Sequence, residues 1–234
     1  MGLRCKRCGS EEQVKNGLMR SKQRYRCKAC GLNFTDTPAR GKPLAMKATA
    51  VLLYVSGLSM NRTAKLLGVS TPTIQAWLEQ FAAAYAQKPE PEGRAVVIEL
   101  DEMWHYLKKK SEPLWIWKAW DRASGQLVDW ECGGRDKATC ERLIARLTCW
   151  RTRLYCTDDY AAYTVLLPLG QHYTGKDETH GIERDNARQR HWLARFRRRS
   201  IVVSKTKRMV DVSLALFARF AGNSRISDLL SMLA

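Results

Sequence analysis

Two closely spaced cysteine pairs constrain the start of this chain more tightly than any other feature. Cys5 and Cys8 form one CxxC pair, Cys27 and Cys30 form a second, and 18 residues lie between the pairs. Four thiolates supplied by two such turns fit the tetrahedral geometry of zinc. A segment this short has little core, so a metal would provide much of its folding energy. The spacing therefore predicts a zinc ribbon over residues 1–40 with one structural zinc ion; chance cysteines or a redox pair are the alternatives.

Length and composition bound the class of protein. A chain of 234 residues, 45% of them hydrophobic, can bury a core and form two or three domains. It has no apolar run of about 18 residues or more and no apolar signal region, so we expect no membrane span and no export. Eight cysteines in such a chain favour reduced thiols or metal ligands over disulfides. We therefore expect a cytoplasmic protein.

The net charge of +17 is distributed unevenly along the chain. Residues 1–93 hold 15 basic and 6 acidic residues, and residues 184–208 hold 10 basic residues and 1 acidic residue. Residues 94–183 hold 13 basic and 14 acidic residues, so a nearly neutral middle lies between two basic regions. Basic regions attract polyanions and give a salt-dependent affinity for nucleic acid. We therefore predict a DNA or RNA partner; a basic surface that only aids solubility is the alternative.

Residues 41–88 are predicted to be all helical and to contain a helix-turn-helix. Gly68 would end the first of the paired helices, Ser70 or Thr71 would cap the second, and Pro72 fits its first turn. The apolar residues that would pack the elbow are Ala64, Leu67, Val69, Ile74 and Leu78. The second helix of such a motif enters the major groove of DNA. The residues predicted to contact DNA are Thr71, Thr73 and Gln75; an ordinary helical hairpin is the alternative.

A break that contains proline and glycine, at residues 89–94, is predicted to link the helical region to the rest of the chain. After it the pattern changes to strands. Strands are expected over 95–107, 113–122, 125–133 and 153–159, with a possible fifth over 170–176. Helices are expected over 136–148, 160–168, 181–197 and within 207–233. Strands first, then alternation with helices, predict an α/β domain with a mixed sheet over residues 95–234.

Three acids lie where solubility alone does not explain a carboxylate. Asp101 lies in the first predicted strand, Asp158 lies at the end of the fourth, and Glu183 opens an arginine-rich helix. The ends of neighbouring strands can converge in space, and a helix across the sheet edge could complete the cluster. Three convergent carboxylates suit two hard divalent ions, preferably magnesium. Two such ions activate a water or hydroxyl for phosphodiester transfer.

Each of these assignments has an alternative that the residues alone leave open. The first acid competes with Glu99 and Glu102, of which Glu99 shares its strand face by alternation. The second competes with Asp159, which could cap the following helix. Glu183 could instead form an ion pair with Arg184 or Arg188 of its own helix. A further acid, Asp121, is expected to support the site or to form the turn that follows it.

The order of these motifs resembles the transposases of the insertion-sequence-one family, of the fused InsA–InsB type. The resemblance covers essentially the whole chain. Besides the paired CxxC, it is carried by GLSMNRTAKLLGVSTPTIQAWL at 57–78, ELDEMW at 99–104, LWIWKAWDRASG at 114–125, TDDYAAY at 157–163 and THGIERDNARQRHWLARFRRRSIVVSKT at 179–206. The resemblance implies a ribonuclease-H-like catalytic core with a DDE triad.

Position by position, the resemblance places the triad on Asp101, Asp158 and Glu183, and it selects Asp158 over Asp159. It also implies that Arg190, seven residues after Glu183, faces DNA. Such proteins are often made by frameshifting between two reading frames, whereas this sequence reads as one fused product. Whether a shorter DNA-binding product also exists is left open.

The resemblance also implies the reaction and the partners. The predicted protein is a bacterial DNA transposase, associated with the nucleoid, that binds the terminal inverted repeats of an insertion sequence. It would cleave DNA to leave 3′-hydroxyl ends and join them to target DNA, using two magnesium or manganese ions. Because two ends must be cut and joined together, we expect a homodimer or a larger homo-oligomer. A non-catalytic DNA-binding regulator of the element is the alternative.

A basic run near the end of the arginine-rich helix is predicted to hold phosphates beside the site. Its predicted DNA-contacting members are Arg197, Arg198, Arg199 and Lys205, and the same run includes Arg195, Lys207 and Arg208. A solvated, charged helix face is the alternative.

Overall fold

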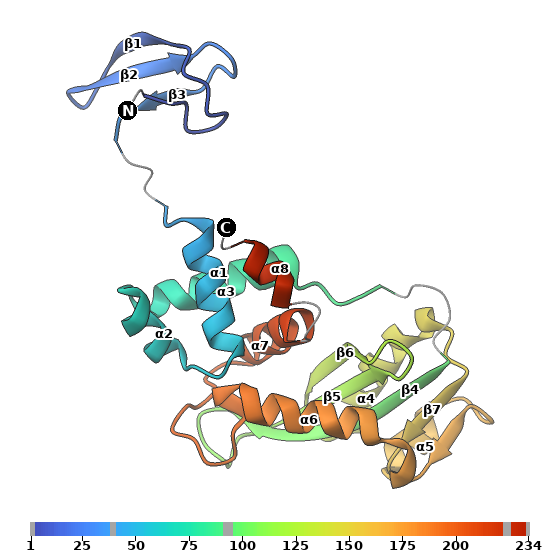
Figure 1. The fold of residues 1–234 in the computed structure, drawn as a ribbon. Helices are drawn as coiled ribbons and strands as arrows, with labels where there is room; N and C mark the ends of the chain where they lie inside the picture. The colour runs from blue at the N-terminus through green and yellow to red at the C-terminus, as the bar shows by residue number, and fades with distance from the viewer. Residues whose placement is uncertain (1–2, 38–40, 91–95, 222–225, 233–234) are drawn as a thin grey trace. The chain divides into compact units, whose positions relative to one another are not determined.

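The structure is a computed structural model, and it describes residues 3–37, 41–90, 96–221 and 226–232 (Figure 1). The chain divides into two compact units, Met1–Pro43 and Leu44–Ala234. Most of the predicted linker, residues 91–94, lies outside the described residues, as do residues 38–40 at the end of the predicted ribbon. The predicted domain limits therefore stay predictions.

The first unit is a small three-stranded antiparallel sheet. Strand β1 (Gln13–Met19) pairs with β2 (Lys22–Cys27), and β2 pairs with β3 (Asn33–Thr35). Among its described residues, the buried apolar ones are Cys5, Cys27 and Phe34, and partly buried neighbours such as Tyr25 pack against them. So small a core buries too little apolar surface to stabilise a fold alone.

Three helices open the second unit: α1 (Leu44–Val55), α2 (Met60–Leu67) and α3 (Thr71–Tyr85). Gly68 ends α2 in the left-handed conformation, with φ of 61°, which glycine adopts without strain. The hydroxyl of Ser70 caps α3 by accepting a hydrogen bond from the backbone N–H of Thr73 at 3.3 Å. In the elbow, Ala64, Ile74 and Leu78 are buried and Leu67 and Val69 partly buried. The predicted helix-turn-helix is confirmed.

A five-stranded sheet follows, in the order β6-β5-β4-β7-β8. Its strands are β4 (Val97–Tyr106), β5 (Pro113–Asp121), β6 (Gln126–Gly133), β7 (Leu154–Thr157) and β8 (His172–Thr174). The β4–β5 and β5–β6 pairs are antiparallel, and the β4–β7 and β7–β8 pairs are parallel, so the predicted mixed sheet is confirmed. Asp121 forms the β5–β6 turn, because its carboxylate accepts hydrogen bonds from the N–H groups of Ala123 and Ser124.

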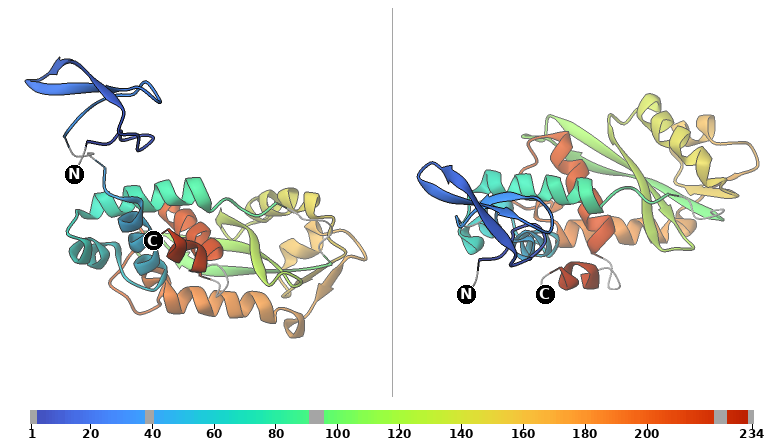
Figure 2. Two further views of the ribbon diagram at one scale, coloured as in Figure 1. Left: turned by 45° about the horizontal axis from the view of Figure 1, so that its top comes forward. Right: turned by 90° about the horizontal axis from the view of Figure 1, so that it is seen from above.

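Helices cover both faces of this sheet (Figure 2). On one face lie α4 (Lys137–Leu147) and α5 (Ala161–Leu166), which bury Ile98 and Leu100 of β4. On the other lie α6 (His180–Trp192) and α7 (Lys207–Phe220), and α8 (Ile226–Ser231) packs against α1 and α7. The predicted helix 181–197 ends earlier, at Trp192, because Leu193 adopts an extended conformation before a short 3-10 turn, Ala194–Phe196.

The helix-turn-helix and the sheet share one hydrophobic core. Buried residues of α1 and α3 pack in the same cluster as α7 and apolar residues of β4, β5 and β6, among them Met103 and Ile116. Helix α3 is therefore packed against the same body that carries the acids of β4. Among the described residues, no helix is both long and apolar enough to cross a lipid bilayer.

Candidate active site

The register of two parallel strands brings Asp101 and Asp158 to the same level of the sheet. Glu99 of β4 pairs with Cys156 of β7, and each acid lies two residues further along its own strand direction. Strand β7 ends at Thr157, whereas β4 continues to Tyr106. Beyond the last β4–β7 pair, the edge of β4 therefore faces Asp158 instead of another strand. The predicted convergence of these two acids follows from this arrangement.

Glu102 is the third member of this acidic group. One carboxylate oxygen each from Asp101, Glu102 and Asp158 lies within 4.8 Å of the others. Glu102 is buried on the opposite face of β4 from Asp101. There it accepts hydrogen bonds from Arg135 Nε at 2.9 Å and from the hydroxyl of Tyr163 at 3.1 Å. Its charge is thus already compensated by Arg135.

The electrostatics of this group favour a bound cation. Burial raises the pKa of Asp101, and the charges of Asp158 and Glu183 raise it further, whereas Lys118 lowers it. Burial also raises the pKa of Glu102, with Arg135 acting in the opposite direction. Carboxylates that are buried close together ionise at a free-energy cost unless a positive charge joins them. An oxygen donor set of this kind suits magnesium or manganese.

Glu183 lies in the first turn of α6 and is not part of this group. Its side chain is exposed, and its Oε1 accepts a hydrogen bond from the hydroxyl of Thr179 at 3.4 Å. Its charge nevertheless raises the pKa of Asp101, so the two carboxylates are within electrostatic reach of each other. The structure thus brings two members of the predicted triad together and leaves the third nearby.

Glu99, the alternative to Asp101, is fully engaged elsewhere. Its Oε2 accepts a hydrogen bond from the backbone N–H of Ile182 at 2.9 Å, and its Oε1 accepts one from Arg122 at 2.9 Å. It thereby holds the start of α6 against the sheet. The approach is so close that a Cβ on Gly181 would lie 2.5 Å from Trp120 Nε1 and 2.9 Å from Glu99 Oε2. Asp159, the alternative to Asp158, is exposed.

A buried polar network supports Asp101 from α6. Asn186 donates a hydrogen bond from Nδ2 to Asp101 Oδ2 at 2.5 Å, and its Oδ1 accepts one from Lys118 Nζ at 2.7 Å. Lys118 lies opposite Asp101 in the β4–β5 register, is fully buried, and also forms an ion pair with Asp185. Gln189 donates a further hydrogen bond to Asp185 at 2.7 Å. These residues connect the sheet, the helix and the acidic group.

Sequence reasoning missed Lys118, Asn186 and Tyr163, and it treated Glu102 only as a competitor of Asp101. The signal for Lys118 was present, because a lysine in the middle of the apolar strand WIWKAWD must find a buried partner. The partners on α6 and the hydroxyl of Tyr163 could not be assigned without the fold.

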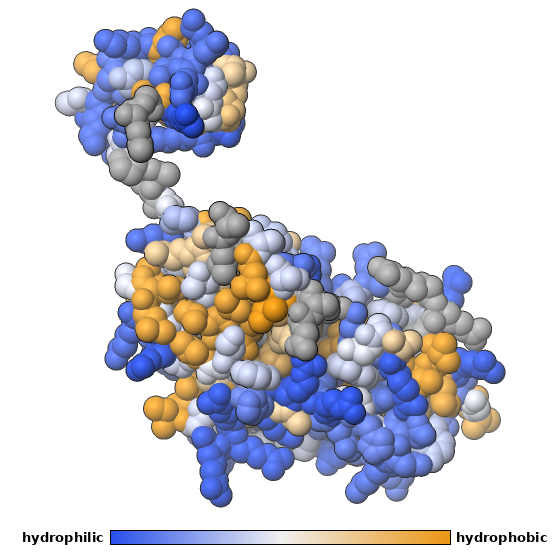
Figure 3. All heavy atoms as spheres, viewed as in Figure 1, coloured by the Kyte–Doolittle hydropathy of each residue, from blue (hydrophilic) through white to orange (hydrophobic). Residues whose placement is uncertain are grey.

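The basic residues predicted to contact DNA fall into two groups. Arg197, Arg198, Arg199 and Lys205 are exposed. Arg190 is partly buried; burial and the charge of Arg198 lower its pKa, and Asp101 acts in the opposite direction. On the face seen in Figure 3, hydrophilic residues gather over α6, and apolar residues gather over α1 and α8.

Arg195 does not share this exposure, which corrects its place in the predicted run. It is buried, and it donates hydrogen bonds to the hydroxyl of Tyr54 at 2.6 Å and to Ser204 at 3.3 Å. Ser204 also bonds to His105 of β4 at 2.8 Å. Arg195 therefore joins α1 to the sheet and is not available to phosphates.

The predicted recognition residues lie at the start of α3. Gln75 is exposed and donates a hydrogen bond to Glu79 at 3.0 Å. Thr71 and Thr73 are partly exposed; Thr71 donates to Asn61 at 3.0 Å, and the hydroxyl of Thr73 lies 2.8 Å from that of Ser70. Side chains at the open start of the second helix are those that reach base edges in this motif.

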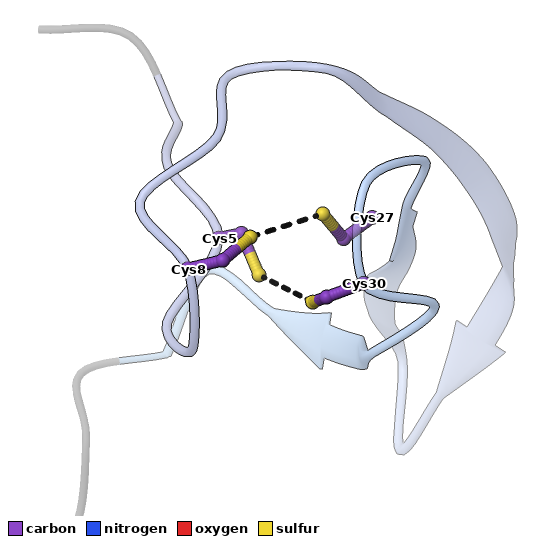
Figure 4. Close-up of side chains that lie close together, drawn as sticks. All are labelled: Cys5, Cys8, Cys27 and Cys30. Atoms are coloured by element: carbon purple, nitrogen blue, oxygen red, sulfur yellow. Dashed lines mark hydrogen bonds between the residues drawn. The ribbon is translucent and has the colours of Figure 1, made fainter.

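The four predicted zinc ligands converge in the first unit (Figure 4). The sulfur atoms of Cys5 and Cys30 are 3.5 Å apart, and those of Cys8 and Cys27 are 3.6 Å apart. Sulfur atoms around a tetrahedral zinc ion, with bonds of about 2.3 Å, lie roughly 3.8 Å apart. The distances and the donor set therefore fit zinc.

The titration of these thiols also favours a metal. Backbone N–H groups of Cys8 and Arg7 lower the pKa of Cys5 to about 6. Although the N–H of Ser10 lowers the pKa of Cys8, hydrogen bonding to Cys30 and the other sulfurs raises it to about 12. Four sulfurs this close cannot all be thiolates at neutral pH without a cation among them.

Two family models match this chain. The model described as IS1 transposase matches residues 95–220, and the model described as a homeodomain-like domain matches residues 43–86. Among curated relatives, the insertion element iso-IS1n protein InsB of Shigella dysenteriae is 31% identical over 123 residues, which are 53% of this chain and 94% of the relative. The insertion element IS1 protein InsB of Shigella flexneri is 35% identical over 116 residues, which are 50% of this chain and 88% of the relative.

Solved structures give only distant similarities. A simian T-cell lymphotropic virus intasome in complex with PP2A regulatory subunit B56 gamma has a TM-score of 0.39 at 16% identity, over 76% of this chain and 69% of the other. The Mos1 transposase paired-end complex has a TM-score of 0.24 at 13% identity, over 56% of this chain and 57% of the other.

The matched region of the IS1 family model spans β4 to α7 and so contains Asp101, Glu102, Asp158 and Glu183, while the homeodomain-like model matches α1 to α3. The chain belongs to the IS1 transposase family.

Proposed function

We propose that this transposase cleaves DNA at the ends of its insertion element and joins the resulting 3′-hydroxyls to target DNA, with Asp101, Asp158 and Glu183 as its catalytic acids. The observation that supports this most is the level placement of Asp101 and Asp158 beside β4, with Glu183 on the adjoining helix turn. Acids gathered at one point of a chain with a net charge of +17 are otherwise hard to explain. The five-stranded mixed sheet supports a ribonuclease-H-like fold for this core.

Asp101 and Asp158 are better placed than Glu102 to hold a divalent ion. Both oxygens of Glu102 accept hydrogen bonds, from Arg135 and Tyr163, and Arg135 supplies a compensating charge. We therefore assign Glu102 the task of fixing the middle of β4 through Arg135 and Tyr163. Among the described residues, the carboxylate of Glu183 has only the long hydrogen bond from Thr179, so its side chain is free to turn toward the two aspartates.

When bound, two magnesium or manganese ions would supply Lewis-acid stabilisation to the attacking and leaving oxygens of an in-line displacement at phosphorus. In the first step, water attacks the scissile phosphodiester, and the bond to the 3′ oxygen breaks to leave a 3′-hydroxyl. In the second step, that hydroxyl attacks a target phosphodiester. A new P–O bond forms as the bond to the target strand's 3′ oxygen breaks, which leaves a 3′-hydroxyl on the target strand. Asp101 on β4 and Asp158 directly after β7 would hold their carboxylates in place, and Arg190, whose charge interacts with that of Asp101, would bind the DNA phosphates.

The remaining predicted sites complete the proposal. Cys5, Cys8, Cys27 and Cys30 would bind one structural zinc ion, and this ribbon together with Thr71, Thr73 and Gln75 of α3 would bind the terminal inverted repeats. Arg197, Arg198, Arg199 and Lys205 would hold backbone phosphates. Two ends must be processed together, so the active form would be a homodimer or a larger homo-oligomer.

The decisive test is strand cleavage and joining on duplexes that carry the ends of the element, with magnesium present. Asp101→Asn and Asp158→Asn should each abolish cleavage while end binding is retained. Asp159→Asn, which changes an exposed neighbour of Asp158, is the matched control and should cleave as the unmodified chain does. Cleavage that survives Asp101→Asn would show that the assignment is wrong.

A non-catalytic regulator that only binds the element ends is the second candidate, because the helix-turn-helix alone accounts for DNA binding. It predicts binding of the end duplexes with no cleavage or joining under any divalent ion. Gel-shift and cleavage assays on the same duplexes separate the two functions.

A further inference from the structure

Lys118 is the one described lysine that is fully buried, and the proposed reaction gives it no task. It lies in the middle of β5, opposite Asp101 of β4, on the face of the sheet that α6 covers. An ammonium group in such a place must be matched by acceptors. Its acceptors come from two consecutive residues of α6, Asp185 and Asn186.

The ammonium of Lys118 decides which way the Asn186 amide points. An ammonium group can only donate hydrogen bonds, so the amide oxygen must face it. Lys118 Nζ is 2.7 Å from Asn186 Oδ1, and the amide nitrogen therefore faces the other way, 2.5 Å from Asp101 Oδ2. With the opposite orientation, two oxygens would face each other at Asp101.

Asp185 completes the anchor. It is buried, forms the ion pair with Lys118, and accepts a second hydrogen bond from Gln189 one turn later at 2.7 Å. Asp185 lies two residues after Glu183 on the same helix. The lysine that orients Asn186 therefore also fixes, through Asp185, the helix that carries the third proposed acid.

We propose that Lys118 is a positioning residue for the phosphodiester reaction: through Asn186 it holds Asp101 in its ion-binding orientation, and through Asp185 it holds α6 and Glu183 beside it. This inference rests on the proposed function, because it assigns Asp101 to the reaction. It extends that function to three residues, Lys118, Asp185 and Asn186, that touch neither DNA nor a metal.

Binding of manganese to the DNA-free chain, measured by calorimetry, tests positioning without any reaction. Removing a nearby positive charge strengthens cation binding if Lys118 acts only through its charge, because like charges repel. If Lys118 acts by positioning, Lys118→Met weakens manganese binding although the site becomes more negative, by about tenfold, as expected for the loss of a group that orients a metal ligand. Asn186→Leu, which leaves the Lys118–Asp185 pair intact, should weaken it to the same extent. Equal or tighter binding in both variants would overturn the proposal.

The rate of end cleavage gives a second, independent readout. A displacement of reacting groups by an ångström costs on the order of 100-fold in rate. Lys118→Met and Asn186→Leu should each slow single-turnover cleavage by about that factor, and the double variant should be no slower than either. Multiplying effects, about 10⁴-fold in the double variant, would show that Lys118 does not act through Asn186.

The two readouts separate this proposal from the one on which it rests. If the unmodified chain binds manganese, loses it in Asp101→Asn, and never cleaves, the proposed reaction fails while the calorimetry still decides the role of Lys118. If the chain neither binds manganese nor cleaves, both proposals are refuted. Lys118→Met leaves Asp185 unpaired and can destabilise the fold. Asn186→Leu keeps the Lys118–Asp185 pair, so it tests the proposal in a folded chain, and circular dichroism checks that this variant is folded.

Discussion

The thiol cluster of the first unit and the carboxylate group of the second bring metal-binding side chains together in different ways. The four cysteines come from two short turns of a unit that has hardly any other core. Asp101 lies on β4 and Asp158 directly follows β7, and the two meet only because these strands pair in parallel inside a large core. In the first unit, a bound metal would stabilise the fold. In the second, the pairing of the strands positions the acids.

The difference extends to what completes each site. All four predicted thiol ligands already converge. The sulfur atoms of Cys5 and Cys30 are 3.5 Å apart, and those of Cys8 and Cys27 are 3.6 Å apart. Of the three predicted acids, Glu183 is outside the group, and Glu102 has joined it. The thiol site, whose ligands lie in two short turns, therefore has all its predicted ligands in place. The carboxylate group instead lies in a unit with a large hydrophobic core of its own.

The largest expected effect is the loss of the first unit when a thiol is removed. Cys27→Ser should release zinc and unfold residues 3–37, because metal binding supplies about 10–16 kcal/mol to such small units. Zinc content and the dispersion of amide signals in nuclear magnetic resonance spectra measure this. Cys149→Ser, at an exposed cysteine of the second unit, is the control. One zinc per chain retained in Cys27→Ser would contradict the zinc ribbon.

In the second unit, the effect of removing an acid on the free energy of unfolding should depend on whether that acid has a buried positive partner. Asp185→Asn removes the partner of the buried Lys118 and should cost about 3–5 kcal/mol of unfolding free energy. Asp101→Asn removes a charge that burial and other acids disfavour, so stability should be unchanged or higher. Urea unfolding followed by tryptophan fluorescence compares them. Equal losses in both variants would show that Asp101 is structural, as the thiols are.

Acidification should weaken the second unit through His105. Burial, together with Arg195, lowers the pKa of His105 from its usual 6.5 to about 4. The unfolded chain takes up a proton as the pH falls below 6.5, whereas the folded chain does so only near 4, so the contribution of His105 to stability is lost across this window. Between pH 7 and pH 5 the loss is about 2 kcal/mol.

Urea unfolding at the two pH values measures this effect. In His105→Gln the part of the pH dependence that comes from His105 should vanish, while the rest is kept. A variant that loses stability on acidification as steeply as the unmodified chain would contradict the assignment.

The smallest expected effect is that of a purely local device. Ser70→Ala removes the hydroxyl that caps α3 and should cost about 1 kcal/mol. Ser70→Gly should lose only a few tenths of that unit, since glycine is tolerated at this position. The thermal unfolding midpoint of the second unit orders the two variants. A larger loss in the glycine variant would show that the cap is not what Ser70 contributes.

Particular residues show how far the sequence could be read. Gly68, Ser70 and Pro72 predicted the helix-turn-helix correctly because turn and cap chemistry act within a few residues. The predicted helix over 181–197 was too long, because Leu193 turns inward to a core that the local pattern does not contain. Arg195 was grouped with exposed arginines for the same reason, since its partners Tyr54 and Ser204 are distant in sequence.

The sequence by itself determined those features that depend on interactions between residues close together in the chain. They are the CxxC turns, the caps of α2 and α3, the strands, and the acids that belong to no local ion pair. What only the tertiary structure decided were contacts across the sheet: the level placement of Asp101 and Asp158, the compensation of Glu102 by Arg135, and the burial of Lys118 against α6. Buried charges take their roles from partners, and those partners are distant in the chain until it folds.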